Sequence, residues 1–148
     1  MNADWAVCEV EWHAQRAALH AIRRAVFVEE QRVPEALEWD DLDARCQHVL
    51  AYSPQRTAIG TGRLLPDGHI GRMAVLKAWR GKGVGRAMLV FLLGLARQKG
   101  FDAVHLHAQT HALGFYARHG FTVVGDEFME AGIPHRAMVL QLKTAPGG

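Results

Sequence analysis

The segment Arg80–Arg86 combines three basic side chains with three glycines at alternating positions, and this combination suits the binding of an anion. It lies between a strand-like run at 70–75 and a pattern at about 83–99 whose apolar residues recur with a helical period. Glycines allow the backbone to approach a ligand closely, and N–H groups at a helix N-terminus are free to donate. Since the helix dipole also favours negative charge there, the segment predicts a phosphate or pyrophosphate site.

The spacing within this segment excludes the two commonest phosphate-binding motifs. A P-loop continues with Lys-Ser or Lys-Thr, whereas this chain has Gly85 followed by Arg86. A dinucleotide fingerprint needs G-x-G-x-x-G in the first βαβ unit, and here the glycines are spaced differently and lie in the middle of the chain. A tight strand-to-helix connection without a ligand remains the alternative.

Several segments together resemble one family. Arg80-x-x-Gly83-x-Gly85 is similar to the R/Q-x-x-G-x-G/A signature of the GNAT superfamily, the acyl-coenzyme A-dependent N-acetyltransferases. The strand before it, 71–75, and the later segment 112–121 also resemble that family. The resemblance to the ElaA-type subgroup rests on 24–31, on 132–135, and on the residues Pro34, Glu38, Asp40, Asp43 and His48. The resemblance covers about residues 5–142.

The resemblance implies where acetyl-coenzyme A would bind as cosubstrate. The pantetheine arm would pair with the backbone of the strand before the signature, and an unpaired N–H there would polarise the thioester carbonyl. The pyrophosphate would lie on the amides of the glycine-rich turn, whose basic side chains are otherwise a solvated surface. The cofactor-binding residues expected are Met73, Ala74, Val75, Arg80, Gly81, Lys82, Gly83, Val84, Gly85, Arg86 and Gln109.

Acetyl transfer from a thioester to an amine needs a proton acceptor for the amine and a proton donor for the leaving thiolate. The resemblance places the hydroxyl of Tyr116 near the sulfur, where it would act as the acid; a core aromatic is the alternative. The base stays open, because the proton could leave through water to Glu29, Glu30, His107 or His135. His135 follows Gly-Ile-Pro in an expected turn, and it is the second catalytic candidate, against an exposed loop histidine as the alternative.

Two further clusters of polar residues have both a functional and a structural interpretation. The acidic loop, with Glu35, Glu38, Asp40, Asp41 and Asp43, could attract a cationic amine, or it could be solvated or paired with arginines. His105, His107 and Gln109 share one face of a strand and, with His111, suggest zinc. No carboxylate or cysteine completes a recognisable ligand spacing, so we expect no metal.

Strand and helix patterns alternate along the chain in the order β-α-β-β-β-α-β-α-β-β. This order predicts an α/β protein of the α+β mixed-sheet kind, with a mostly antiparallel central sheet covered by helices on both faces, as in the GNAT fold. The expected strands are 5–12, 46–52, 57–65, 70–75, 103–108, 122–129 and 136–142, and the expected helices are 13–28, 83–99 and 110–119, with a last turn at 131–134.

Composition limits the remaining choices. The length of 148 residues predicts one domain, 1–148, with 144–148 as a loose tail. A net charge of only +2 gives no argument for nucleic acid. The two separated cysteines, the lack of a signal peptide and the short apolar stretch at 87–96 predict a cytoplasmic protein with no membrane segment.

The expected function is transfer of an acetyl group from acetyl-coenzyme A to a small-molecule amine or a peptide amino group. A non-catalytic acyl-coenzyme A binding or sensing domain is the alternative, and a homodimer is left open.

Overall fold

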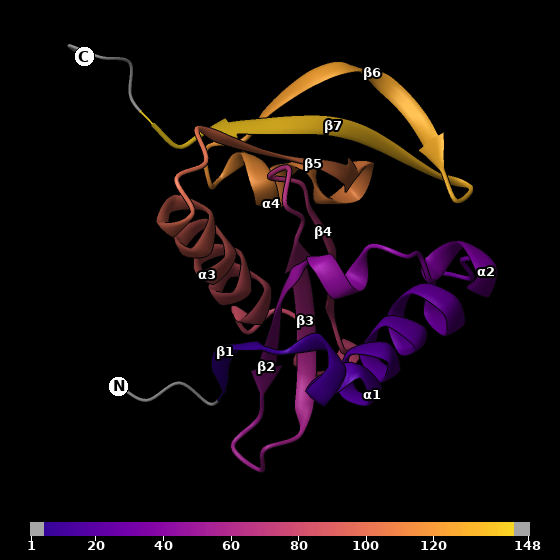
Figure 1. Ribbon diagram of the computed structural model, residues 1–148. Coiled ribbons are helices and arrows are strands. Elements are labelled where there is room, and N and C mark those ends of the chain that lie inside the picture. Colours follow the sequence, from indigo (N-terminus) through magenta and orange to yellow (C-terminus); the bar gives the residue numbers. More distant parts are fainter. Residues whose placement is uncertain (1–4, 144–148) are drawn as a thin grey trace.

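The strands of the computed structural model, which describes residues 5–143, form two antiparallel sheets (Figure 1). The first sheet has the order β1-β2-β3-β4, and the second has the order β5-β7-β6. One isolated parallel bridge, His69 to His105, joins the strands β4 and β5 at their beginnings. The strands are β1 (Ala6–Val10), β2 (Gln47–Tyr52), β3 (Ala58–Leu64), β4 (Ile70–Val75), β5 (Ala103–Gln109), β6 (Thr122–Glu130) and β7 (Ile133–Gln141).

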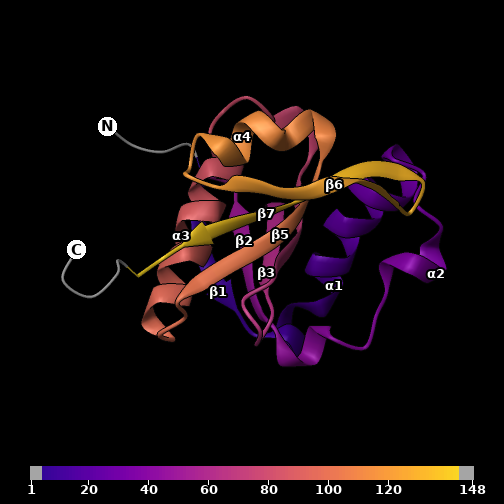
Figure 2. The same ribbon diagram turned by 90° about the horizontal axis from the view of Figure 1, so that it is seen from above.

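The two long helices cover opposite faces of the first sheet (Figure 2). The alternation of β2 shows why: Val49 and Ala51 pack in the cluster that contains the apolar face of α3 (Val84–Gln98), whereas Leu50 packs in the cluster of α1 (Trp12–Arg23). The shorter helices are α2 (Glu35–Glu38) and α4 (Leu113–Ala117), with 3₁₀ turns at 43–45, 77–79 and 110–112. The predicted fold class and element order are confirmed, and the central sheet is divided between β4 and β5.

Two of the differences from the expected boundaries concern segments that line the pocket described below. The first helix does not stop near Val28, because α1 runs into a π-helical segment, Arg24–Glu30. The last turn is shorter than 131–134, since Ala131 and Gly132 both have left-handed φ angles, 52° and 76°, which suit a two-residue hairpin. Strand β7 therefore begins at Ile133. Pro134 is tolerated because it lies beyond Gln109–His135, the last pair between β5 and β7.

A bulge in β4 marks the edge where the two sheets separate. Thr61 pairs with Ala74 and Arg63 pairs with Gly71, so that two residues of β4 lie opposite one residue of β3. Arg72, in the bulge, has a left-handed φ of 51°, a conformation that a residue with a Cβ rarely adopts. Such strain persists only where surrounding contacts hold it, and here the contacts come from the acidic loop described below.

Candidate active site

A pocket of about 420 Å³ lies between β4 and β5. The π-helical segment and α2 form one wall, and the β6–β7 hairpin, which extends toward α2 in Figure 1, forms the opposite wall. The lining therefore combines segments that are far apart in the sequence, among them Phe27, Gln31, Met73, His107, Tyr116 and Glu130. A ligand in the pocket would contact both sheets.

Tyr116 lines this pocket and points toward β4. Its hydroxyl lies 3.8 Å from the Sδ atom of Met73, and its ring packs edge-on against Phe115 and Phe121. Burial raises the pKa of Tyr116 to about 12, so the hydroxyl keeps its proton at neutral pH. The arrangement places a proton donor beside the strand that was expected to hold the pantetheine arm.

The glycine-rich turn has the backbone conformation that the sequence suggested. Gly81 and Gly83 have φ angles of 76° and 91°, and Gly83 is the N-cap of α3 without a side-chain cap bond. The first turn of α3 holds no acidic residue. Lys82 and Arg86 are exposed, whereas the side chain of Val84 is buried in the core. The amides at this end of α3 are therefore available to an anion.

Arg80 is held by another part of the protein. Its guanidinium binds both carboxylate oxygens of Glu30, at 2.5 and 2.7 Å, and its Nε donates to the carbonyl of Val75 at 2.9 Å. This pairing lowers the pKa of Glu30. The π-helical segment thus connects the end of β4 to the turn, and Arg80 positions that turn in addition to any contact with a phosphate.

Gln109 lies on the pocket side of β5 rather than near the turn. Its amide donates to the Oε1 atom of Gln31 at 2.9 Å, and its own Oε1 lies 2.8 Å from the Nε2 atom of His111. This bridge connects the end of β5 to the end of the π-helical segment. Gln109 therefore closes one end of the pocket.

His135 is not a turn residue, as the sequence suggested, but a buried residue of β7 with 6% of its surface exposed. The strand register explains its neighbours: Gln109 lies opposite it on β5 and Phe128 opposite it on β6. Side chains on opposed residues share a face, and so do those two residues away. His107 and Glu130 therefore lie on the same face as His135.

These three residues form a polar cluster in the pocket. The Nδ1 atom of His107 lies 2.9 Å from Glu130 Oε1, and the Nε2 atom of His135 lies 3.8 Å from Glu130 Oε2. The Nδ1 atom of His135 lies 2.7 Å from the carbonyl oxygen of Ile133. Since this carbonyl can only accept, the Nδ1 atom of His135 carries the proton.

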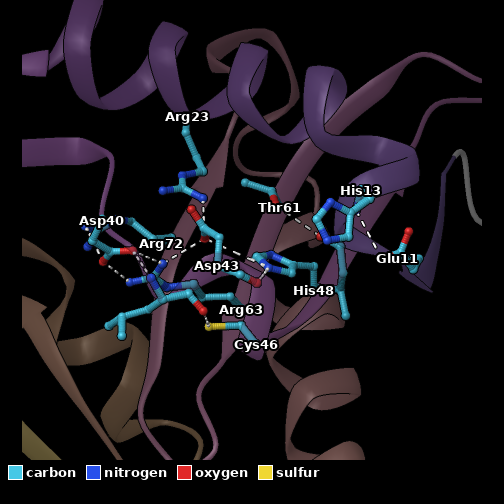
Figure 3. Close-up of polar contacts among 12 residues, drawn as sticks. Glu11, His13, Arg23, Asp40, Asp43, Cys46, His48, Thr61, Arg63 and Arg72 are labelled. Atoms are coloured by element: carbon cyan, nitrogen blue, oxygen red, sulfur yellow. Dashed lines mark hydrogen bonds and ion pairs between the residues drawn. The ribbon is translucent and has the colours of Figure 1, made fainter. Parts of the chain in front are cut away.

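The acidic loop is paired with arginines, and Figure 3 shows this network beside α1. Asp43 accepts from both Arg23 and Arg63 at 2.8 Å. Glu38 accepts from Arg23 at 2.9 Å and lies 3.0 Å from Arg72, whose terminal nitrogens also reach Asp40 at 3.3 Å. Glu38, Asp40 and Asp43 are therefore paired with arginines, which is the structural alternative for this part of the loop.

Two carboxyl groups of this network are shifted in opposite directions. Hydrogen bonds from Arg63 outweigh the burial of Asp40 and lower its pKa to about 2. Burial raises the pKa of Glu38 despite its arginine neighbours. The bulge residue Arg72 is thus anchored by two carboxylates and by the carbonyl of Glu38 at 3.1 Å.

The histidines on β5 do not form a metal centre. Residues 5–143 contain no group of three or more His, Cys, Asp or Glu side chains arranged to hold a metal ion. His69, which packs edge-on against both His105 and His107, has a pKa lowered to about 4, chiefly by burial. It is neutral at neutral pH.

Glu130 is the pocket residue that sequence reasoning missed. Phe128 and Glu130 share a face by their spacing of two, but the expected turn at 131–134 left His135 outside the hairpin. A two-residue turn at Ala131–Gly132 would have put Glu130 beside His135. For Phe27, in the π-helical segment, and Gln31, directly after it, no spacing in the sequence indicated a place in the pocket.

Comparison with known proteins identifies the family of this site. A family model described as an acetyltransferase (GNAT) domain matches residues 11–142. The chain is 38% identical over 122 residues to YjcF of Bacillus subtilis (strain 168), described as an uncharacterized N-acetyltransferase, covering 80% of this chain and 86% of that one. It is 33% identical over 136 residues to the protein ElaA of Escherichia coli (strain K12), covering 87% and 89%.

Solved structures show the same fold. An acyl-CoA N-acyltransferase from Pseudomonas aeruginosa superposes with a TM-score of 0.79 at 32% identity, covering 94% of this chain and 99% of that one. Escherichia coli ElaA superposes with a TM-score of 0.82 at 29% identity, covering 93% and 99%. Within residues 5–143, none of the helices is long and apolar enough to cross a membrane.

Proposed function

Since the chain belongs to the GNAT acetyltransferase family, we propose that it transfers an acetyl group from acetyl-coenzyme A to an amine by direct attack on the thioester. The observation that supports this most is the hydroxyl of Tyr116, which lies 3.8 Å from Met73 Sδ in a pocket shared by β4 and β5. A proton donor and the strand expected to hold the thioester are thus adjacent. The proposed acceptor is a small-molecule amine or a peptide amino group, and the proposed location is the cytoplasm.

In the proposed complex, the pantetheine arm lies along the backbone of Met73, Ala74 and Val75. The pyrophosphate lies on the amides of the turn at 80–86, where Gly81, Gly83 and Gly85 keep the backbone open. Lys82 and Arg86, both exposed, add positive charge. Arg80 orients the turn through Glu30. Gln109 is proposed to contact the acyl end of the cosubstrate from β5. No metal takes part.

The chemistry requires four linked changes of bonding. The acceptor ammonium first gives a proton to the Nε2 atom of His135, which is unprotonated in the neutral ring. The amine nitrogen then attacks the thioester carbon, and the carbonyl electron pair moves to oxygen. As the carbonyl reforms, the C–S bond breaks, and the thiolate takes the proton of Tyr116. The amide nitrogen loses its extra proton to water, and the proton held by His135 returns through water to the Tyr116 phenolate. The side chains are thereby restored, and the products are the N-acetyl amine, coenzyme A and one proton.

Replacement of Tyr116 by phenylalanine tests the proposed acid. The change removes one hydroxyl and keeps the ring packing against Phe115 and Phe121. We expect turnover to fall by about 10²–10⁴-fold while the affinity for acetyl-coenzyme A changes little. Single-turnover rates and calorimetric binding separate the two quantities. An unchanged chemical rate would make Tyr116 a packing residue.

Two glycine variants test the proposed phosphate site. Gly83 and Gly100 both have left-handed φ angles, 91° and 82°, but they lie at opposite ends of α3. Both Gly83→Ala and Gly100→Ala should strain the backbone, yet Gly83→Ala alone should weaken acetyl-coenzyme A binding, by about tenfold or more. Equal affinities of the two variants, measured where both are folded, would contradict this placement.

A melting-temperature measurement does not separate the enzyme from a non-catalytic coenzyme A binder with the same fold. With either function, acetyl-coenzyme A would raise the melting temperature, whereas ATP and NAD would not. A panel of amines assayed for release of free thiol separates the two functions, because the binder would release none.

A further inference from the structure

Glu130 is the carboxylate of the pocket whose negative charge no arginine or lysine neutralises among the described residues. Building on the proposed acetyl transfer, we propose that Glu130 binds the ammonium group of the acceptor and selects cationic primary amines that carry an apolar body. His107 is the residue that positions Glu130.

The contact between Glu130 and His107 fixes the carboxylate. A carboxylate oxygen can only accept, so the Nδ1 atom of His107, 2.9 Å away, carries a proton and donates it. This bond occupies Oε1 and leaves Oε2 directed at His135. The carboxylate is therefore held in the pocket with one oxygen unoccupied by a protein donor at short distance.

The contact between Glu130 and His135, at 3.8 Å, is too long for a hydrogen bond. The Nδ1 proton of His135 is donated to the carbonyl of Ile133, so the Nε2 atom of the neutral ring is an acceptor. It faces Glu130 Oε2, a second acceptor, at 3.8 Å. A ligand with several N–H donors on one nitrogen satisfies both acceptors, and an alcohol with its single O–H does not. The same geometry gives the ammonium proton a path to Nε2 of His135.

Among the described residues that line the pocket, no arginine or lysine is paired with Glu130. In the same pocket, Glu38 and Arg72 neutralise each other at 3.0 Å. His69, which packs against His107 from the beginning of β4, is neutral because its pKa is lowered to about 4. His105 lies on the same strand as His107 and faces Asp67 at 4.0 Å. An ammonium group is therefore attracted to this end of the pocket, and an anionic acceptor is repelled.

The other wall of the pocket carries three apolar side chains beside the polar residues Gln31 and Glu38. Phe27 comes from the π-helical segment, Leu37 from α2 and Val33 from the stretch between them, and Leu37 is 57% exposed. Apolar surface of this kind gains free energy when a ligand covers it. Across the pocket from Glu130, it suits an acceptor whose ammonium is attached to a hydrocarbon or aromatic group.

Benzylammonium and benzyl alcohol form a matched pair of probes for this site, since they differ in charge and in the number of donors. Calorimetry at about pH 7, on the protein loaded with coenzyme A, should show benzylammonium binding at least about tenfold more tightly. Glu130→Gln should remove that preference and leave the affinities for benzyl alcohol and for coenzyme A unchanged. Glu127→Gln, on the same strand but exposed and outside the pocket, should behave as the unmodified protein.

Variants of His107 test the positioning role. His107→Leu removes the donor and should weaken benzylammonium binding, whereas His107→Asn, whose amide can replace the Nδ1–H donor, should restore most of it. In the acetylation assay, the same preference should appear as a higher KM for benzylamine in Glu130→Gln than in the unmodified protein. Equal binding of the two probes, or a preference that survives Glu130→Gln, would overturn the proposal while coenzyme A still binds. If the unmodified protein did not bind coenzyme A at all, the proposed acetyl transfer itself would be overturned.

Discussion

The network beside α1 and the cluster on β5–β7 both bring carboxylates and basic side chains together, but they differ in what remains unpaired. In the network, Asp43 accepts from two arginines at 2.8 Å, and its side chain is 6% exposed. In the cluster, the Glu130 side chain is 45% exposed and is held by one histidine at 2.9 Å. The network has its charges matched internally, and the cluster has an acceptor left for a ligand.

This difference shows how to separate structural from functional charges in one protein. A buried charge must be paired within the protein, since an unpaired one costs several kcal/mol, about 3–5 when one partner is removed. A charge intended for a ligand is instead part-exposed in a pocket and incompletely paired. The acidic loop drew attention in the sequence because it holds several carboxylates, yet Glu38, Asp40 and Asp43 are paired with Arg23, Arg63 and Arg72.

The largest effect on stability is expected from Asp43→Ala. The change leaves Arg23 and Arg63 in the interior without a shared partner, and it should lower the free energy of unfolding by about 3–5 kcal/mol. Urea unfolding measures it, with Asp41→Ala, an exposed carboxylate of the same loop, as the control. If both variants unfolded at the same urea concentration, Asp43 in the network would contribute no more to stability than an exposed carboxylate does.

A smaller, pH-dependent effect is expected from Asp40. Its pKa is lowered from 3.8 to about 2, so its pairing stabilises the fold above about pH 4, and that contribution is lost as the pH falls toward about 2. The contribution is about 2 kcal/mol. The contribution of Glu38 to stability depends on pH in the opposite direction. Because its raised pKa makes protonation easier in the folded state, lowering the pH through that range favours the fold.

Asp40→Asn should therefore be less stable than the unmodified protein at pH 6, and the gap should narrow as the pH falls from about 4 to 3. Urea unfolding at several pH values between 6 and 3 measures the gap. A gap that stays constant with pH would mean that the Asp40 charge is not what stabilises the native state.

The order of strands and helices could be predicted from the sequence because its signals are local, and the resemblance of Arg80-x-x-Gly83-x-Gly85 to the family signature added the GNAT fold. The period of α3, the glycines of the turn and the alternation of the strands each act over a few residues. The pocket could not be predicted in the same way. The partner of Asp43 is Arg63 on β3, and the neighbour of His107 is Glu130 on β6, and such pairings arise from register and packing. The turn at Ala131–Gly132 shows that a two-residue error in one boundary is enough to hide a site residue.

The smallest effect is expected from the exposed pair Arg24–Glu35, which gives a reference for the comparison. Both side chains are nearly half exposed, at 45% and 47%, so solvent weakens their attraction. A double-mutant cycle with Arg24→Ala and Glu35→Ala should give a coupling far smaller than the loss of stability in Asp43→Ala. A coupling as large as the loss in Asp43→Ala would show that burial does not distinguish these pairs.

The single bridge between the two sheets has a consequence for how the chain can be divided. The first sheet and α3 end at residue 98, and the second sheet begins at residue 103, so a break between them interrupts none of the described strand pairs. The halves would still share an apolar core, where Leu106, Phe121 and Met138 pack with α3. We therefore expect two separately expressed fragments, 1–100 and 101–148, to recombine by that apolar surface and to restore the proposed acetyl transfer only when mixed.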